Sequence, residues 1–414
     1  MTYIICALAV GYFIFLLIGM RLGHSAGAVV RMSLDGVKTA WTLMIILLLI
    51  GVLTGTWRGA GSIVTIVYYG IQLIRPKLFL IVAYLVTCLL SYALGTSFGV
   101  AGTAGVIFMT LARGGGVDPV LTAGALLSGI YFGDRTSPAS STAFTVASVT
   151  QTNLYTNVRN MLRTGLIPWL LCFVCYAWFS VRNPISTMDP EVLKAFRETF
   201  TISAWTILPA VIILIFPLLH IPILITLCSS IAAAAAVSMI LQKASFLSLF
   251  RTALLGYHAA DPAVAAILDG GGMISMADTV IIVALACSYT GIMNGSGMIG
   301  ILGARIGKAA DRRGLFPCMI LICLVAAAVF CNQVVAIILC ESLLGPSYEK
   351  KGKSREELAI DIENTAITIP ALIPWCILCS VPLAIFGVSY AAVPYAIYSY
   401  AIPLVNLAMK KRKN

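Results

Sequence analysis

An oxygen-rich stretch interrupts an apolar segment at residues 131–142, which read YFGDRTSPASST. Gly133 and Pro138 break helices, and the carboxylate of Asp134 lies between them. The hydroxyls that follow belong to Ser137, Ser140, Ser141 and Thr142. Carboxylates, hydroxyls and freed backbone carbonyls are the oxygen ligands that small hard cations prefer. The stretch therefore predicts a discontinuous helix that binds a small cation. The structural alternative is a helix cap, or an ion pair between Asp134 and Arg135 at the water interface.

A second stretch of this kind lies at residues 361–375, which read DIENTAITIPALIPW. Two prolines follow a group of polar residues, so another helix break is expected there. The polar residues of this group are Asp361, Glu363, Asn364 and Thr365. For Asp361, the alternative interpretation is that it belongs to the solvated loop that precedes this stretch. We expect Glu363, Asn364 and Thr365 to contribute to the same site as Asp134.

Two further interruptions follow apolar segments, one at Gly95–Ser97 and one at Cys331–Gln333. Helix ends at membrane depth expose unpaired backbone groups, which are tolerated only where they line a cavity or bind a ligand. Interrupted segments at corresponding places in two halves of a chain point to a transport site. This pattern predicts Thr96, Ser97, Asn332 and Gln333 as further binding residues.

Acidic residues inside apolar segments are costly and are functional by default. A buried carboxylate that takes up a proton avoids that cost and can carry the proton across a membrane. The candidate proton carriers are Asp134, Asp278, Glu341 and Glu363. For Asp278, alone in an apolar run, a site role and a buried hydrogen bond remain equally open.

Apolar helices must position these polar groups. Of the 414 residues 60% are hydrophobic and only 10% are charged, and the mean hydropathy is +0.99. Apolar stretches of roughly 20 residues, long enough to cross a bilayer, recur along the whole chain. We predict an all-α membrane protein with roughly 10–12 transmembrane helices, whose main partner is the lipid bilayer.

The net charge of +11 comes from residues that lie between the apolar segments. It therefore indicates how the chain is oriented in the membrane and not that the protein binds nucleic acid. The closing KKRKN predicts a cytoplasmic C-terminus.

The two halves of the chain echo each other. TGTWRGAGSI at residues 54–63 and TGIMNGSGMI at residues 290–299 share five of ten residues at an offset of 236. A second echo, LIPWLLC against LIPWCILC, has an offset of 206. We expect an N-terminal repeat at residues 1–180, a linker at 181–198 and a C-terminal repeat at 199–414. Inverted repeats with broken helices and re-entrant hairpins are favoured.

These motifs resemble a known family. GDRTSPASST is similar to the Gly-Asp-x-x-Ser-Pro-x-Ser-Asp-Thr signature of the NhaC family of sodium/proton antiporters, and ENTAITIPALIPW is similar to that family's Glu-Asp segment. The resemblance implies exchange of sodium for protons by alternating access, with sodium at Asp134, Ser140 and Thr142. It implies no cofactor beyond sodium or a proton as coupling ion.

Two departures from the family pattern matter. Ser141 and Asn364 each stand where the family usually has Asp. Because both halves lack one carboxylate, a sodium- or proton-coupled transporter of an amino acid or carboxylate is kept as the alternative. An enzyme is not expected, since GTSFG at residues 95–99 lacks the strand–turn–helix setting of a nucleophile elbow. So compact a chain is expected in a bacterial inner membrane. Whether the protein forms a homodimer is left undecided.

Overall fold

The computed structural model describes residues 2–73, 75–185, 190–219, 221–259, 264–265, 268–297 and 314–411. Over these residues the chain is helical, apart from connections and one isolated β-bridge between Tyr257 and Gly270. The prediction of an all-α fold is confirmed. The expected echo at residues 290–299 and the basic C-terminal run extend in part beyond the described residues.

The first half of the chain alternates long helices with short ones. Its elements are α1 (Thr2–Arg21), α2 (Ala26–Thr39), α3 (Trp41–Gly59), α4 (Ser62–Leu73), η1 (Pro76–Leu78), α5 (Phe79–Leu94), α6 (Ser97–Val100), η2 (Ala101–Gly105), α7 (Val106–Gly114), α8 (Pro119–Thr136), α9 (Ser141–Thr150) and α10 (Leu154–Arg182).

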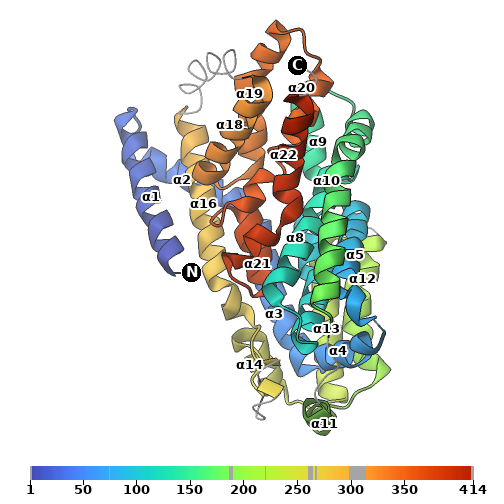
Figure 1. Cartoon of the computed structure of the whole chain (residues 1–414). Helices are drawn as coiled ribbons and strands as arrows, with labels where there is room; N and C mark the ends of the chain where they lie inside the picture. The colour runs from blue at the N-terminus through green and yellow to red at the C-terminus, as the bar shows by residue number, and fades with distance from the viewer. Residues whose placement is uncertain are drawn as a thin grey trace.

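The second half begins with α11, which lies at one end of the bundle (Figure 1). Its elements are α11 (Pro190–Thr199), η3 (Ala204–Ile207), α12 (Leu208–Leu218), α13 (Ile223–Ile240), α14 (Phe246–Leu255), η4 (Met273–Met276), α16 (Ala277–Ser296), α18 (Leu315–Phe330), α19 (Gln333–Lys350), α20 (Arg355–Glu363), η5 (Ile369–Leu372), α21 (Ile377–Phe386), η6 (Tyr390–Tyr395) and α22 (Ile397–Lys411).

Five helical segments of the described chain are long and apolar enough to cross a membrane. They are Trp41–Gly59, Pro76–Leu94, Leu154–Arg182, Ile223–Ile240 and Met273–Met293. This is fewer than the predicted 10–12, because other apolar segments form shorter helices. Those of 10–17 residues are Ile5–Arg21, Ala204–Phe216, Phe246–Leu255, Leu315–Phe330 and Ile377–Phe386.

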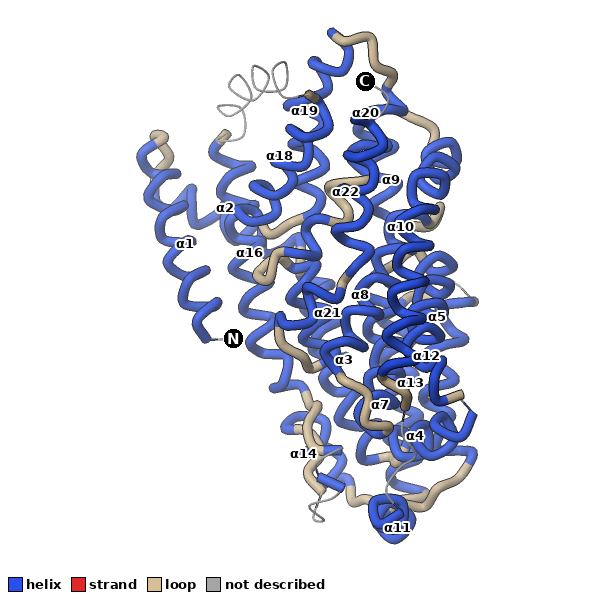
Figure 2. The backbone as a smooth tube through the Cα atoms, in the orientation of Figure 1, coloured by secondary structure: helices blue, strands red, loops and turns tan. Residues whose placement is uncertain are grey.

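Two helical hairpins enter the bundle from opposite ends. After α5 the chain turns back through α6 and η2 into α7, which lies near α4 at the lower end in Figure 2. After α18 it turns back into α19, and this pair occupies the upper end of Figures 1 and 2. Within the upper pair, the thiols of Cys323 and Cys340 lie 3.3 Å apart across the two arms.

The two hairpin turns have the same local geometry. Gly95 and Cys331 end the first arms in the left-handed conformation, with φ of 65° and 56°. The next residue is extended and caps the second arm. Thr96 accepts a hydrogen bond from the Gly99 N–H, and Asn332 accepts from Val334 N–H. At each turn, a helix N-terminus with a polar cap residue therefore lies within the protein.

Glycines bring α8 against α5. A Cβ at Gly133 would lie 2.1 Å from the Ser91 carbonyl carbon, and one at Gly129 would lie 2.0 Å from Thr87 Oγ1. Small residues four positions apart let two membrane helices approach closely. The Ser91 hydroxyl then donates to the Ile130 carbonyl at 2.5 Å. This contact fixes the last turn of α8, which carries Asp134.

Candidate functional site

Asp134 lies in a ring of oxygen atoms at the predicted break between α8 and α9. The residue is only 4% exposed. The Ser140 hydroxyl donates to its Oδ1 at 3.2 Å, and the Thr142 hydroxyl lies 3.3 Å from the same atom and 3.2 Å from the Asp134 carbonyl oxygen. The two hydroxyls are 2.7 Å apart. The oxygen atoms of three residues thus lie within 3.3 Å of one another, and such a group of oxygen atoms suits a small cation.

The two hairpin turns complete this group. The Asp134 carboxylate also interacts with the side chains of Ser97 and Gln333, the first residues of α6 and α19. Both side chains are buried, and Gln333 Nε2 donates to the Ile367 carbonyl at 3.3 Å. Segments far apart in the sequence therefore meet at one carboxylate. We call Asp134, Ser140, Thr142, Ser97 and Gln333 the Asp134 cluster.

Helix N-termini surround the same carboxylate. Ser140 caps α9 by accepting from the Thr142 and Ala143 N–H groups, at 3.2 and 3.4 Å. The N-termini of α6 and α19 begin at Ser97 and Gln333. The positive end of a helix dipole stabilises a negative charge. These groups offset part of the cost of a buried negative charge at Asp134, and their oxygen atoms can serve as ligands of a small cation.

The neighbouring Arg135 points away from Asp134 into the protein. It is fully buried, and its guanidinium donates to the Met161 carbonyl at 2.9 Å and to Tyr398 Oη at 3.3 Å. It also donates to Thr164 Oγ1 at 2.8 Å and to Asn364 Oδ1 at 2.5 Å. The alternative of an Asp134–Arg135 ion pair at the water interface is wrong, because the cation lies inside the bundle and is bound by neutral oxygens.

Glu363 is the second buried carboxylate and has a very different setting. It is fully buried at the end of α20, and neither carboxylate oxygen has a hydrogen-bond partner among the described residues. It interacts electrostatically with Arg135 and Asp134. An ionised carboxylate without a hydrogen bond is expensive in an apolar interior. Glu363 is therefore suited to a neutral, protonated state.

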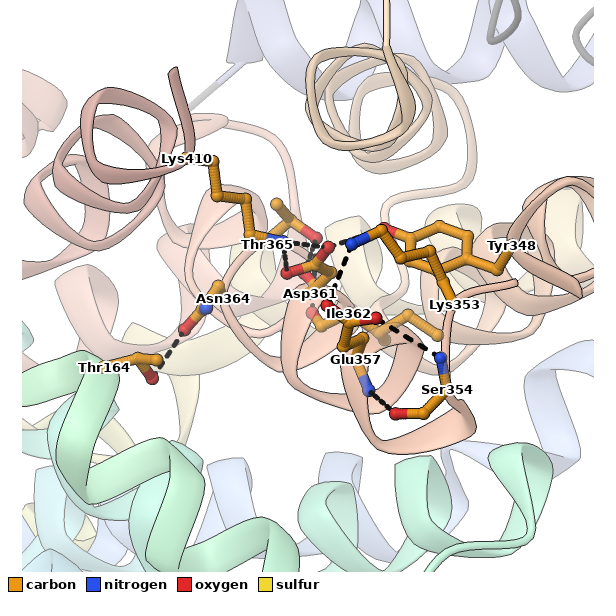
Figure 3. Close-up of polar contacts among 10 residues, drawn as sticks. All are labelled: Thr164, Tyr348, Lys353, Ser354, Glu357, Asp361, Ile362, Asn364, Thr365 and Lys410. Atoms are coloured by element: carbon orange, nitrogen blue, oxygen red, sulfur yellow. Dashed lines mark hydrogen bonds and ion pairs between the residues drawn. The ribbon is translucent and has the colours of Figure 1, made fainter. Parts of the chain in front are cut away.

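Asp361 belongs to a polar contact of its own. Its carboxylate is 1% exposed and binds the Lys410 ammonium, and Tyr348 Oη donates to Oδ2 at 2.6 Å. Figure 3 shows Lys410 and Tyr348 approaching Asp361 from opposite sides. Asp361 therefore does not belong to a solvated loop, which was the alternative. The same view shows the Asn364 side chain directed toward Thr164.

Other predicted site residues lie around the Asp134 cluster without entering it. Ser137 is buried and accepts a hydrogen bond from the Ala139 N–H at 3.1 Å, and Thr365 donates to the Asp361 carbonyl at 2.7 Å. Thr96 and Asn332 are half-buried and cap their helices. These residues shape the turns that present the ligands.

Three predicted residues lie outside the buried site. Ser141 is exposed on the first turn of α9, and Asp278 is exposed on the first turn of α16. Glu341 is half-buried and lies eight residues along α19 from Gln333 (341 − 333), about 12 Å at the rise of a helix. It lines a cavity of about 240 Å³ together with Tyr348 and Glu349. Asp278 and Glu341 are therefore not part of the pair of buried carboxylates.

A larger cavity adjoins the first hairpin turn. It has a volume of about 390 Å³ and is lined by Ala93, Leu94, Thr96, Gly99, Ala139, Ile221 and Ile223. Thr96 and Ala139 are neighbours in sequence of the cluster residues Ser97 and Ser140. The cavity therefore ends beside the Asp134 cluster.

Arg135 and three of its partners, Met161, Thr164 and Tyr398, were not predicted as site residues, whereas its fourth partner, Asn364, was. The sequence does carry a signal, because an arginine within an apolar membrane segment is as costly as an acid. Its partners Thr164 and Tyr398 carry none, since a threonine or a tyrosine on an apolar helix is ordinary. Their role follows only from the fold, which brings α10 and α22 to the end of α8.

Comparison with known proteins gives a consistent picture. A model of the Na+/H+ antiporter family matches residues 129–409. The chain is 27% identical over 376 residues to a malate-2H+/Na+-lactate antiporter of Bacillus subtilis, covering 89% of this chain and 80% of the relative. It is 26% identical over 391 residues to the Na+/H+ antiporter NhaC of Bacillus subtilis, covering 90% and 84%. It is also 26% identical over 366 residues to the arginine/ornithine antiporter ArcD of Halobacterium salinarum, covering 82% and 73%.

Proposed function

The chain belongs to the Na+/H+ antiporter family, and on that premise we propose that it exchanges sodium for protons, with the Asp134 cluster as the sodium site. It is a secondary antiporter and not an enzyme. The observation that carries the sodium site is the convergence of the Ser140 and Thr142 hydroxyls on Asp134 Oδ1, at 3.2 and 3.3 Å. Oxygen ligands beside a broken helix are the usual setting for a coupling sodium ion.

Proton transport is assigned to the buried carboxylates. When sodium leaves, the buried Asp134 carboxylate is left without its cation, and a proton is the smallest replacement. Glu363 supports this role because it is buried and has no hydrogen-bond partner among the described residues. Asp134 and Glu363 interact electrostatically, so a cation at one disfavours a proton at the other. Competition between sodium and protons for one pair of carboxylates produces exchange.

Helices that begin at matching positions in the two halves of the chain support the presence of two repeats. α3, α5, α8 and α9 begin at residues 41, 79, 119 and 141, and α16, α18, α20 and α21 begin at 277, 315, 355 and 377. Each difference is 236 (277 − 41, 315 − 79, 355 − 119, 377 − 141). This offset equals the first echo in the sequence. The second echo, at 206, does not fit, because the offset of 236 carries Leu166 to Ile402 and not to Leu372.

An inverted arrangement of these repeats fits alternating access. The α5–α7 hairpin and the α18–α19 hairpin point in from opposite ends of the bundle (Figure 2). In this proposal α8 with α9, and α20 with α21, form discontinuous crossings, which raises the number of crossings toward the predicted 10–12. One module moves against the rest and carries the midplane site from one side to the other. A cytoplasmic C-terminus, in a bacterial inner membrane, completes the proposed topology.

A specific observation favours a second candidate, exchange of an organic solute. The residues that replace family carboxylates are Ser141, which is exposed, and Asn364, which accepts from the buried Arg135. Two relatives are named as antiporters of malate and lactate, and of arginine and ornithine. An uncompensated buried arginine is the group that a carboxylate solute would bind.

Everted membrane vesicles test the proposal. The chain is produced in a host that lacks its own sodium/proton antiporters, and a fluorescent pH probe follows proton movement after sodium is added. We expect sodium-dependent proton movement that disappears with Asp134→Asn and persists with the matched Asp278→Asn, whose carboxylate is exposed. Vesicles that show no such movement but accumulate labelled lactate, malate or arginine would support the second candidate.

A further inference from the structure

The cavity beside the first hairpin turn is much larger than a sodium ion needs. Its volume of about 390 Å³ lies within the range of pockets that bind small organic molecules, roughly 300–1,000 Å³. Among its seven described lining residues, Thr96 alone carries a polar side chain. Gly99 leaves room beside Thr96, because a Cβ at Gly99 would lie 2.6 Å from Thr96 Cγ2. Such a lining suits the hydrocarbon part of an organic ligand.

The break between α8 and α9 lines this cavity and also carries the Asp134 cluster. Ala139 lines the cavity, and the next residue, Ser140, has its hydroxyl 3.2 Å from Asp134 Oδ1. Gly95 packs against both residues, since a Cβ on it would lie 2.4 Å from the Ala139 carbonyl carbon and 2.6 Å from the Ser140 nitrogen. The first hairpin turn and the break therefore hold the cavity beside the oxygen atoms of the cluster.

The charged group next to this cavity is the Asp134 carboxylate and not the Arg135 guanidinium. The guanidinium donates to residues of α10, of α22 and of the break after α20. None of these segments contributes a described residue to the cavity lining. A ligand whose apolar part lies in the cavity therefore meets a negative charge, and this charge favours a positively charged head group.

A primary ammonium group matches the oxygen atoms of the cluster. It carries one positive charge and three N–H donors. Asp134 Oδ1 and the hydroxyl oxygens of Ser140 and Thr142 lie within 3.3 Å of one another, and each can accept a hydrogen bond. Hydrogen bonds from a charged donor to a carboxylate are among the strong ones. The three oxygen atoms that suit sodium therefore also suit an ammonium ion.

We propose that the Asp134 cluster and the adjoining cavity together form a binding site for a primary alkylammonium ion, whose head group replaces sodium and whose alkyl chain lies in the cavity. This inference rests on the proposed function, because it takes the Asp134 cluster as the cation site. It adds an organic cation as a second class of ligand. Sodium and the alkylammonium ion exclude each other, and the affinity for the organic ion rises with the length of its chain.

Displacement of radioactive sodium from purified protein tests this site. The competitors are methyl-, ethyl-, propyl- and butylammonium at neutral pH, where their amino groups are charged. Each buried methylene strengthens binding about fourfold, so butylammonium should displace sodium at a concentration about sixtyfold lower than methylammonium. Butanol and butyrate carry a similar chain without the positive charge and should not displace sodium.

The outcomes for the unmodified protein are distinct. Displacement that strengthens with chain length supports the site. Equal displacement by all four ammonium ions, or by none, overturns it and leaves the sodium site of the proposed function standing. Butanol or butyrate as effective as butylammonium also overturns it, because the chain would then bind without the carboxylate. Protein that shows neither sodium binding nor sodium-dependent proton movement ends the proposed function, and this site with it.

Two substitutions in the cavity test where the chain lies. Ile223→Ala removes apolar contact and Ala93→Phe fills the space, so the ratio of the methylammonium to the butylammonium concentration should fall about tenfold in each. Ile225→Ala is the matched control, since Ile225 follows two residues later on α13, is 54% exposed and is not among the lining residues. It should keep the ratio. A ratio that stays unchanged in both cavity variants, in protein that binds sodium, contradicts the proposal.

Discussion

Asp134 and Glu363 are both buried carboxylates near a helix break, yet their surroundings differ. Asp134 is bound by the Ser140 and Thr142 hydroxyls and lies among helix N-termini. Glu363 has no hydrogen-bond partner for either oxygen among the described residues. The first environment stabilises an anion and the second stabilises a neutral acid. As part of the proposed function, we therefore assign the metal cation to Asp134 and the proton to Glu363.

The lengths of the two breaks explain this difference. Only four residues, 137–140, separate α8 from α9, so the α9 N-terminus folds directly back onto Asp134. Between α20 and α21 the break covers residues 364–376, and η5 occupies part of it. The N-terminus of α21 is therefore separated from Glu363 by the whole of this break. A short break places the hydrogen-bond donors of the next helix beside the carboxylate, whereas a long break keeps them away from it.

Asp134→Asn is expected to have the largest effect on this comparison. The amide keeps the shape but removes the charge that binds sodium, so sodium binding and exchange should both fall at least a hundredfold. Binding of radioactive sodium to purified protein and exchange in liposomes measure the two losses separately. Sodium binding retained by this variant would place the sodium site elsewhere.

Glu363→Gln is expected to separate binding from exchange. Because the amide cannot take up or release a proton, exchange should fall by a factor of about a hundred, in the range of a lost proton-transfer group. Sodium binding should remain within a few-fold of the unmodified protein, since Asp134 is intact. Equal losses of binding and exchange in the two variants would remove the distinction between the two carboxylates.

Ser140→Ala is expected to have an intermediate effect. It removes the hydroxyl that lies 3.2 Å from Asp134 Oδ1 and that caps α9. A hydrogen bond to a charged group contributes about 1.5–3 kcal/mol, so the sodium concentration for half-maximal exchange should rise about tenfold or more. Ser141→Ala is the matched control, because that neighbouring hydroxyl is exposed, and it should leave the concentration unchanged.

Thermal stability is expected to show the smallest effect. If Glu363 is neutral and unpartnered in the resting protein, Glu363→Gln should change the free energy of unfolding by about 1 kcal/mol or less. Asp361→Asn breaks the pair with Lys410 and should lower stability more, by about 1–3 kcal/mol. Melting temperatures of the detergent-solubilised variants provide the measurement. A larger loss in Glu363→Gln would indicate an ionised, paired carboxylate.

Local features of the site were predictable from the sequence. Gly133 and Pro138 mark the end of α8, and the hydroxyls that surround Asp134 follow within eight residues. Ser97 and Gln333 were found because each lies in an interruption that follows an apolar segment, at corresponding places in the two halves. Such features depend on backbone chemistry within a few residues, which one sequence is enough to reveal.

Depth and direction of a side chain were not predictable. Asp278 and Glu363 were both candidate proton carriers from the sequence, but Asp278 is exposed on the first turn of α16 and Glu363 is fully buried. Arg135 follows Asp134 directly and points to α10 and α22. Both outcomes depend on which helices pack together. Apolar segments such as Leu315–Phe330 and Ile377–Phe386 form helices of only 10–17 residues, so the sequence overestimated the number of helices that are long enough to cross.

The glycine contact between α5 and α8 also restricts how the molecule can move. With backbones touching at Gly129 and Gly133, a slip of one residue would drive a side chain of α5 into the α8 backbone. We therefore expect α5 and α8 to move as one unit in the proposed transport cycle. Sliding would then occur at other interfaces, and the cavity lined by Thr96, Ile221 and Ile223 provides space for it.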